Sequence, residues 1–193
     1  MLRMDNNIFD FNQDNPMKKP KMSKILLIAF LMAICAGLGS FAVRFLFKEL
    51  SNKEIAQEKE FSSNGMTITL TTAFKEGDYI TQTASYVSKD VIVLALKESF
   101  ASSEGFGDIS LKEYGELVLK ANKKTDIGLS DYDGLQGFEY DATDGNTKQD
   151  LHFWLFTYKA DDAFWLIQFC TLQEYQQEFR DKILFWAKSV RFE

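Results

Sequence analysis

An apolar run at residues 25–47 constrains this chain more than any other part of its sequence. The run reads ILLIAFLMAICAGLGSFAVRFLF and contains one charged residue, Arg44, close to its end. A helix of these 23 residues would be about 35 Å long, enough to cross the ~30 Å hydrocarbon core of a bilayer. A buried core helix of this length would carry polar residues at helical spacing, which the run lacks. We therefore predict a single transmembrane anchor.

Two alternatives to an uncleaved anchor follow from residues inside the run. Small residues between Ala33 and Ser40 could form the cleavage site of a signal peptide, although the apolar run continues to Phe47. Cys35 could carry a lipid, but Ile34 precedes it where the processing enzyme requires a small residue. We therefore favour the anchor over both alternatives.

Charge on either side of the run predicts its orientation. Residues 1–24 hold five lysine and arginine residues, four of them within residues 18–24, and this excess favours the cytoplasm for the N-terminal side. The same tail has no periodic apolar face, so we expect it to be disordered. Residues 61–193 would then lie outside the cytoplasm, separated from the membrane by a charged helical spacer at residues 48–60.

Length and charge bound the part beyond the anchor. The 133 residues from 61 to 193 suit one domain with a single core. Residues 48–193 carry a net charge of −9, which disfavours nucleic acid as a partner. Cys35 lies in the predicted anchor and Cys170 in the domain, so the two are not expected to form a disulfide. Cys170 is best interpreted as a small buried residue.

Hydrophobic periodicity predicts the elements of the domain. Alternating apolar residues indicate strands at residues 66–70, 79–87 and 91–96. Ser110 and Glu113 form a capping box at the start of a helix whose apolar stripe extends to Ala121. Three further strands are expected, with hairpin turns at Asp133-Gly134, Asp144-Gly145 and Asp161-Asp162.

The strands at residues 151–159 and 163–171 are apolar on both faces. A strand of this kind must be covered on both sides. A second capping box, Thr171 to Glu174, predicts a second helix, and residues 189–192 predict a last strand. We therefore predict an α+β fold, an α/β/α sandwich with a mostly antiparallel sheet of about six strands and a helix on each face, preceded by one transmembrane helix.

The domain resembles the PsbP-like family, whose fold is shared with the nuclear-import factor Mog. The resemblance rests on the entry strand GMTITLTTAF, the helix SLKEYGELVLK, the aromatic hairpin and the ending LFWAKSVRFE. It covers nearly all of residues 61–193 and involves core patterns rather than site motifs. It implies an α/β/α sandwich that binds other proteins, and it brings no catalytic, metal-binding or partner-binding residue to this chain.

Chemistry-bearing residues are few. His152 is the single histidine, and we interpret it as a structural residue rather than a general base. No spacing typical of a catalytic triad, a phosphate-binding loop or a zinc site is present, and no cofactor is expected. Acidic residues around two turns give weak candidates for calcium ligands, although aspartate is also common in turns: Asp131, Asp133, Asp141 and Asp144.

These observations favour a non-catalytic, membrane-anchored, extracytoplasmic binding module for a protein or a component of the cell envelope. We expect it to bind through its sheet edge or through the loop at residues 99–108. Two alternatives remain open. One is an envelope hydrolase that uses two acidic loop residues, and the other is a calcium-binding domain.

Overall fold

The structure, a computed structural model, describes residues 56–77, 82–102 and 104–193. The predicted tail at residues 1–24, the anchor at residues 25–47 and the spacer up to residue 55 lie outside the described residues. Within the described part, neither helix combines the length and apolar character needed to cross a bilayer.

Antiparallel strands form two sheets in the described part of the chain. The larger has seven strands in the order β3-β4-β5-β9-β8-β7-β6, and the smaller has three in the order β1-β2-β10. The strands are β1 (Glu58–Ser63), β2 (Met66–Thr71), β3 (Lys75–Glu76), β4 (Ala84–Val87), β5 (Ile92–Ser99), β6 (Ser130–Tyr132), β7 (Leu135–Thr143), β8 (Asp150–Lys159), β9 (Ala163–Leu172) and β10 (Arg191–Phe192).

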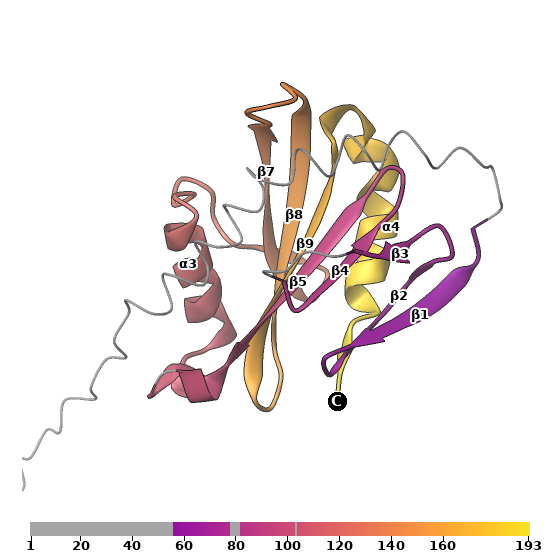
Figure 1. Ribbon diagram of the computed structural model, residues 1–193. Helices are drawn as coiled ribbons and strands as arrows, with labels where there is room; N and C mark the ends of the chain where they lie inside the picture. Colours follow the sequence, from indigo (N-terminus) through magenta and orange to yellow (C-terminus); the bar gives the residue numbers. More distant parts are fainter. Residues whose placement is uncertain (1–55, 78–81, 103) are drawn as a thin grey trace, which may run out of the picture.

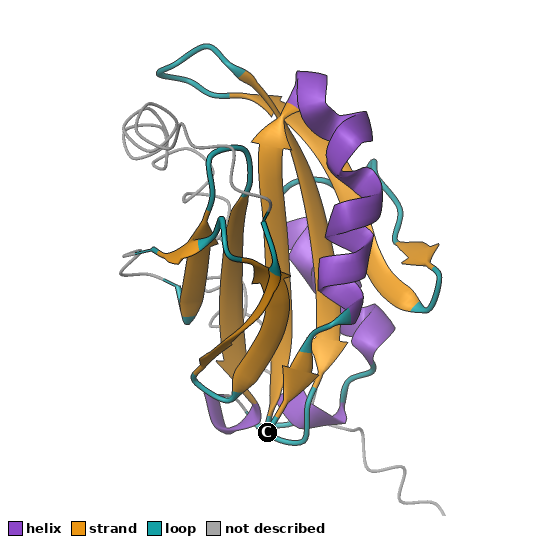
Figure 2. Ribbon diagram, turned by 90° about the vertical axis from the view of Figure 1, so that its right-hand side faces the viewer, coloured by secondary structure: helices purple, strands orange, loops and turns teal. Residues whose placement is uncertain are grey.

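Two helices pack on opposite faces of the seven-stranded sheet. Helix α3 (Leu111–Ala121) covers one face, while α4 (Gln176–Lys188) and the three-stranded sheet cover the other (Figure 1). Seen from the side of α4, one helix lies in front of the strands and the other behind them (Figure 2). Short 3₁₀ turns occur at Phe100–Ser102, Phe106–Asp108 and Gln173–Tyr175.

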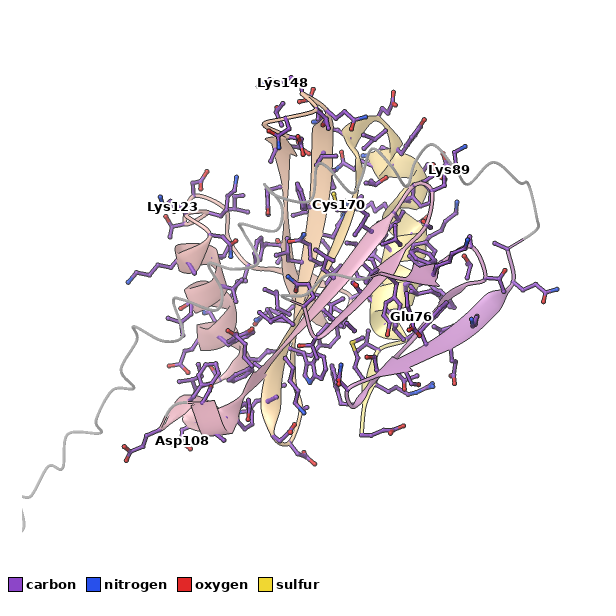
Figure 3. All side chains as sticks on the ribbon, viewed as in Figure 1. Glu76, Lys89, Asp108, Lys123, Lys148 and Cys170 are labelled. Atoms are coloured by element: carbon purple, nitrogen blue, oxygen red, sulfur yellow. The ribbon has the colours of Figure 1, made fainter. Side chains whose placement is uncertain are left out.

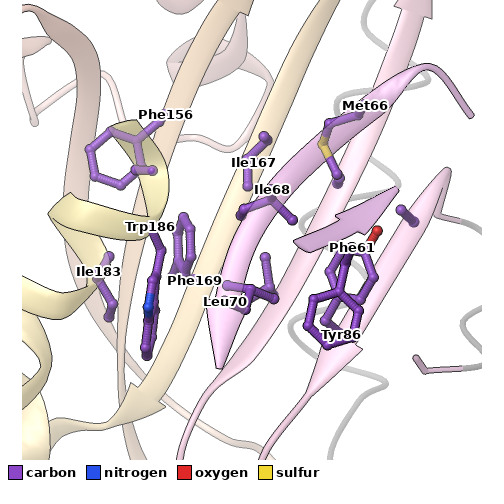
Figure 4. Close-up of a cluster of buried hydrophobic side chains, with 14 of the residues drawn as sticks. Phe61, Met66, Ile68, Leu70, Tyr86, Phe156, Ile167, Phe169, Ile183 and Trp186 are labelled. Carbon is purple, nitrogen blue, oxygen red and sulfur yellow. The ribbon is translucent and has the colours of Figure 1, made fainter. Parts of the chain in front are cut away.

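Alternation along β8 and β9 divides the hydrophobic core in two, as predicted. Trp154 and Phe156 of β8 face α4 together with Ile167 and Phe169 of β9. Figure 4 shows Phe156, Ile167 and Phe169 in this cluster with Trp186 of α4. Leu155, between Trp154 and Phe156 in sequence, belongs to the core beneath α3. The layered α+β arrangement is therefore confirmed for the described residues.

The prediction of a single sheet of about six strands is wrong. β2 and β10, both expected in the main sheet, lie in a separate sheet in which β2 pairs with β1 on one side and with β10 on the other. The Asn64-Gly65 turn, with φ angles of 53° and 84°, joins β1 to β2 as a tight hairpin. β1 begins at Glu58, so the last residues of the predicted helical spacer are strand.

The two predicted capping boxes have different outcomes. At α3, Glu113 N–H donates to Ser110 Oγ at 3.2 Å and Ser110 N–H to the Glu113 carboxylate at 2.8 Å, which confirms the first. The second is wrong because Thr171 remains in β9, where its hydroxyl donates to the carbonyl of Asp90 at 2.7 Å. α4 begins only after the 3₁₀ turn that follows β9.

The predicted hairpin turns also have different outcomes. Asp133 and Gly134 have φ angles of 61° and 92°, and Asp133-Gly134 is the two-residue turn expected between β6 and β7. Asp144-Gly145 is not a tight turn, because residues 144–149 form a six-residue loop between β7 and β8. The Asp144 carboxylate accepts from the N–H groups of Asn146 and Thr147, which stabilises that longer loop.

Gly137 provides a test of the β7–β8 packing. A Cβ at this position would overlap the carbonyl oxygen of Leu155 and the ring of Phe156. We expect Gly137→Ala to lower the free energy of unfolding by about 1–3 kcal/mol. Gly128→Ala is the matched control, because a Cβ there meets nothing within 4 Å. Urea titration followed by tryptophan fluorescence compares the two, and equal stabilities would contradict this packing.

Candidate functional site

One edge of the seven-stranded sheet is open. β6 pairs only with residues 135–137 of β7, and the remainder of β7, residues 138–143, extends beyond it. No described strand pairs with that side of residues 138–143. Unpaired edges expose backbone N–H and C=O groups that can accept another strand.

The register shows which backbone groups of β7 face this open side. In an antiparallel pair, residues alternate between those bonded to the partner strand and those pointing away from it. Asp144 N–H donates to the carbonyl of Gln149 at 2.8 Å, and this pair continues the β7–β8 register. Even-numbered residues of β7 therefore bond to β8. The N–H and C=O groups of Glu139, Asp141 and Thr143 point to the open side.

The side chains of Glu139 and Asp141 form an ionic cluster with His152 and Arg180. His152 lies directly across from Asp141 in the register, and its Nδ1 is 2.5 Å from Asp141 Oδ1. Its Nε2 is 3.3 Å from Glu139 Oε2. Arg180 of α4 donates to both oxygens of Glu139 at 3.2 and 3.1 Å.

Exposure differs sharply within this cluster. The side chain of His152 is 3% exposed and lies edge-on to Trp154, whereas that of Asp141 is 51% exposed. Burial between two carboxylates and an indole favours the interpretation of His152 as a structural residue. It fixes the two acids of β7 on the α4 face of the edge.

The contacts of His152 do not suit it to activate a nucleophile. Both ring nitrogens of His152 contact carboxylates. Thr171 lies across from His152 on β9, but its hydroxyl is committed to the Asp90 carbonyl. A histidine can activate a hydroxyl only where one of its nitrogens is free to accept the proton. These contacts can hold the carboxylates of Glu139 and Asp141 in fixed positions at the edge of the sheet.

The four aspartates considered as calcium ligands are separated in the structure. Asp131 accepts from Gly134 N–H in the β6–β7 turn, and Asp133 pairs with Lys188. Asp144 caps the loop at the other end of β7, and Asp141 contacts His152. Among the described residues, no group of three or more histidine, cysteine, aspartate or glutamate side chains is placed to hold a metal ion.

A second buried polar pair lies under α3. Glu98 of β5 is 2% exposed, and its Oε2 accepts a 2.5 Å hydrogen bond from the hydroxyl of Tyr114. Its other oxygen, Oε1, has no hydrogen-bond partner among the described residues. Burial raises the pKa of Glu98 from 4.5 to about 7, although the hydrogen bond from Tyr114 lowers it.

The loop at residues 99–108, considered as a binding element, packs against this part of the core. Phe106 is buried, and Phe100 contacts its ring and that of Phe164. Lys159 Nζ donates to the carbonyls of Gly107 and Ile109 at 2.8 and 2.9 Å. These contacts give the described part of the loop a structural role beneath α3.

Cys170 is a free, buried thiol, as expected. Burial raises its pKa well above the ordinary value, with a smaller contribution from the charge of Asp144. Figure 3 shows Cys170 within the sheet and Lys148 at the tip of the β7–β8 loop.

Comparison with known proteins finds similarity in structure alone. No protein-family model matches the sequence, and no curated protein sequence does. A solved structure from Bacteroides thetaiotaomicron has 10% identity and a TM-score of 0.49, with 71% of this chain and 49% of that chain covered. This chain thus spans about half the length of that protein.

Two further solved structures match over most of their length. Cyanobacterial PsbP (CyanoP) from Synechocystis sp. PCC 6803 has 11% identity and a TM-score of 0.45, covering 75% of this chain and 98% of its own. The Saccharomyces cerevisiae Ran-binding protein Mog1p has 8% identity and a TM-score of 0.47, covering 71% and 96%. The matches thus include both namesakes of the fold that the sequence resembles. At these identities and TM-scores, no function, partner or site residue transfers to this chain.

Sequence reasoning named a sheet edge as a binding surface but did not place it at β7, and it missed the contacts of Glu139 and Asp141 with His152. Strand alternation could have placed Glu139, Asp141 and His152 on one face, since they lie at odd positions of β7 and even positions of β8. The pairing register, which brings Asp141 across from His152, depends on the length of the loop at residues 144–149. That loop was predicted as a two-residue turn.

Glu98 makes stability depend on pH. Its pKa is higher in the folded chain than in the unfolded chain, so its contribution is complete below about pH 4.5 and is lost as the pH rises through about 7. We expect the free energy of unfolding to fall by up to about 3 kcal/mol from this group between pH 4.5 and 8. Glu98→Gln should flatten this slope.

The control for this measurement is Glu116→Gln, which alters an exposed glutamate on α3. Urea unfolding at several pH values should give the control the slope of the original chain. If Glu98→Gln also keeps that slope, the buried carboxyl does not titrate in this range and the account of Glu98 is wrong.

Proposed function

We propose that residues 58–193 form a non-catalytic binding module for a protein segment, held at the outer face of a membrane by the anchor predicted at residues 25–47. The observation that carries this proposal is the open side of β7 at residues 138–143. Strand addition to an exposed sheet edge is a common mode of peptide recognition, in which main-chain hydrogen bonds supply affinity.

The arrangement of polar groups supports binding over hydrolysis. A hydrolase with two catalytic carboxylates needs them facing each other across the scissile bond. Glu139 and Asp141 instead contact the same histidine, and Glu139 also contacts Arg180. Calcium binding stays a prediction, and the separation of the four candidate aspartates does not favour it.

Site-specific photocrosslinking in intact membranes tests the proposed function. A photoreactive amino acid replaces Thr143, which lies on the open side of β7, in the full chain with a C-terminal tag. The matched control carries it at Phe185, an exposed residue of α4 with 51% exposure. We expect protein adducts from position 143 that are absent or far weaker from position 185. Adducts from position 185 alone would contradict a binding role for this edge.

A further inference from the structure

The charges beside the open edge define which segment can be added to it. We infer that the β7 edge accepts an extended protein segment in which basic and apolar residues alternate, with the basic residues opposite Asp141 and Thr143. This inference rests on the proposed function and specifies the chemistry of its partner. It follows from the direction of the backbone groups, the side chains on each face and the carboxylates along the edge that no described lysine or arginine contacts.

The α4 face of the edge carries three acidic side chains, Glu139 and Asp141 of β7 and Asp150 of β8. Arg180 contacts Glu139, and Asp141 contacts the buried His152 but no described lysine or arginine. Asp150 is exposed and lies across from Thr143, whose hydroxyl donates to its carboxylate at 2.7 Å. Asp141 and Asp150 thus present two carboxylates along the edge. Opposite charges directly across a strand pair stabilise the pairing, and like charges destabilise it.

The backbone of β7 determines which residues of an added strand form hydrogen-bonded pairs with it. Because Asp141 and Thr143 point their N–H and C=O groups outward, an antiparallel segment forms hydrogen-bonded pairs with them. The residues opposite these two positions are separated by one residue, and their side chains project to the α4 face. Basic residues at these positions of the segment therefore meet Asp141 directly and reach toward Asp150.

The α3 face favours apolar residues at the intervening positions. Tyr140 stacks on Phe153 with ring centroids 4.9 Å apart, and Lys124 Nζ lies 4.4 Å above the Tyr140 ring. A basic residue beside Tyr140 would be repelled by Lys124, whereas an aliphatic or aromatic side chain would extend the apolar surface formed with Ala142. The two faces together require alternation of basic and apolar residues.

The same charges disfavour a second copy of this chain at the edge. Two antiparallel β7 edges centred on Tyr140 would place Glu139 of one copy across from Asp141 of the other. Like charges directly opposite destabilise a strand pair. A partner with basic residues removes this repulsion.

Binding of a synthetic peptide to the full chain in neutral detergent micelles tests the inference. The probe is fluorescein-labelled Gly-Ser-Val-Lys-Val-Lys-Val-Ser, followed by fluorescence anisotropy. One control peptide has glutamate in place of both lysines. Another has N-methyl groups on the backbone nitrogens of both lysines, which face β7 in the proposed pairing, so that these hydrogen bonds cannot form. We expect the probe to bind at least about tenfold more tightly than either control.

Variants of Asp141 separate the contribution of its charge from that of its N–H group. Asp141→Asn keeps an oxygen for His152 but removes the charge, and should weaken binding about two- to fivefold. Asp141→Pro also removes the outward N–H, which edge strands tolerate, and should weaken binding about tenfold. Glu60→Gln, an exposed acid on β1, is the matched control and should leave the affinity unchanged.

Several results would overturn the inference. Equal binding of the probe and the glutamate peptide would exclude charge recognition, and equal binding of the N-methylated peptide would exclude strand addition even if Asp141→Pro failed to fold. Equal weakening by Glu60→Gln and Asp141→Asn would indicate diffuse attraction. A dimer that Asp141→Pro dissociates would assign the edge to a second copy. If these tests fail while position 143 still crosslinks to a protein, the binding function stands and the partner chemistry is wrong.

Discussion

The architecture depends on two neighbouring strands, β8 and β9, that are apolar on both faces. Burying an apolar side chain contributes about 1.5–3 kcal/mol, so leaving either face in water would remove much of the stability of a domain this size. α3 covers one face, while α4 covers the other together with the hairpin of β1 and β2. In the three-stranded sheet, Phe61, Met66, Ile68 and Leu70 complete the cover of the second face.

The helices cover the centre of the seven-stranded sheet but do not pair with its edge strands. At one edge β6 is only three residues long, so most of β7 lies beyond its reach. The acids of β7 lie where the α4 face meets this edge, where contacts with the buried His152 and the partly exposed Arg180 hold them in place. Charge on an edge strand normally protects it from pairing with its own kind. The same charge makes the edge selective for a segment of opposite charge.

The periodic parts of the fold were predictable from sequence. The alternation of side chains predicted which residues of β8 and β9 lie on each face of the sheet, and Ser110 with Glu113 predicted the start of α3. Both signals are local in sequence. The second sheet was not predicted, since which strand pairs with which depends on long-range packing. Asn64-Gly65 was a readable hairpin signal, but the residues before it up to residue 60 were predicted as a helical spacer, which hid the start of β1. The candidate site was missed for a similar reason, because the contact of His152 with Asp141 depends on register.

Amide hydrogen exchange along β7, resolved by nuclear magnetic resonance, tests the central claim most directly. The claim is that this strand is bonded to β8 on one side and open on the other. The account predicts alternation: slow exchange at Phe138, Tyr140 and Ala142, and fast exchange at Glu139, Asp141 and Thr143. Uniform protection across these six residues in the free protein would show that the edge is already covered, and would contradict the account.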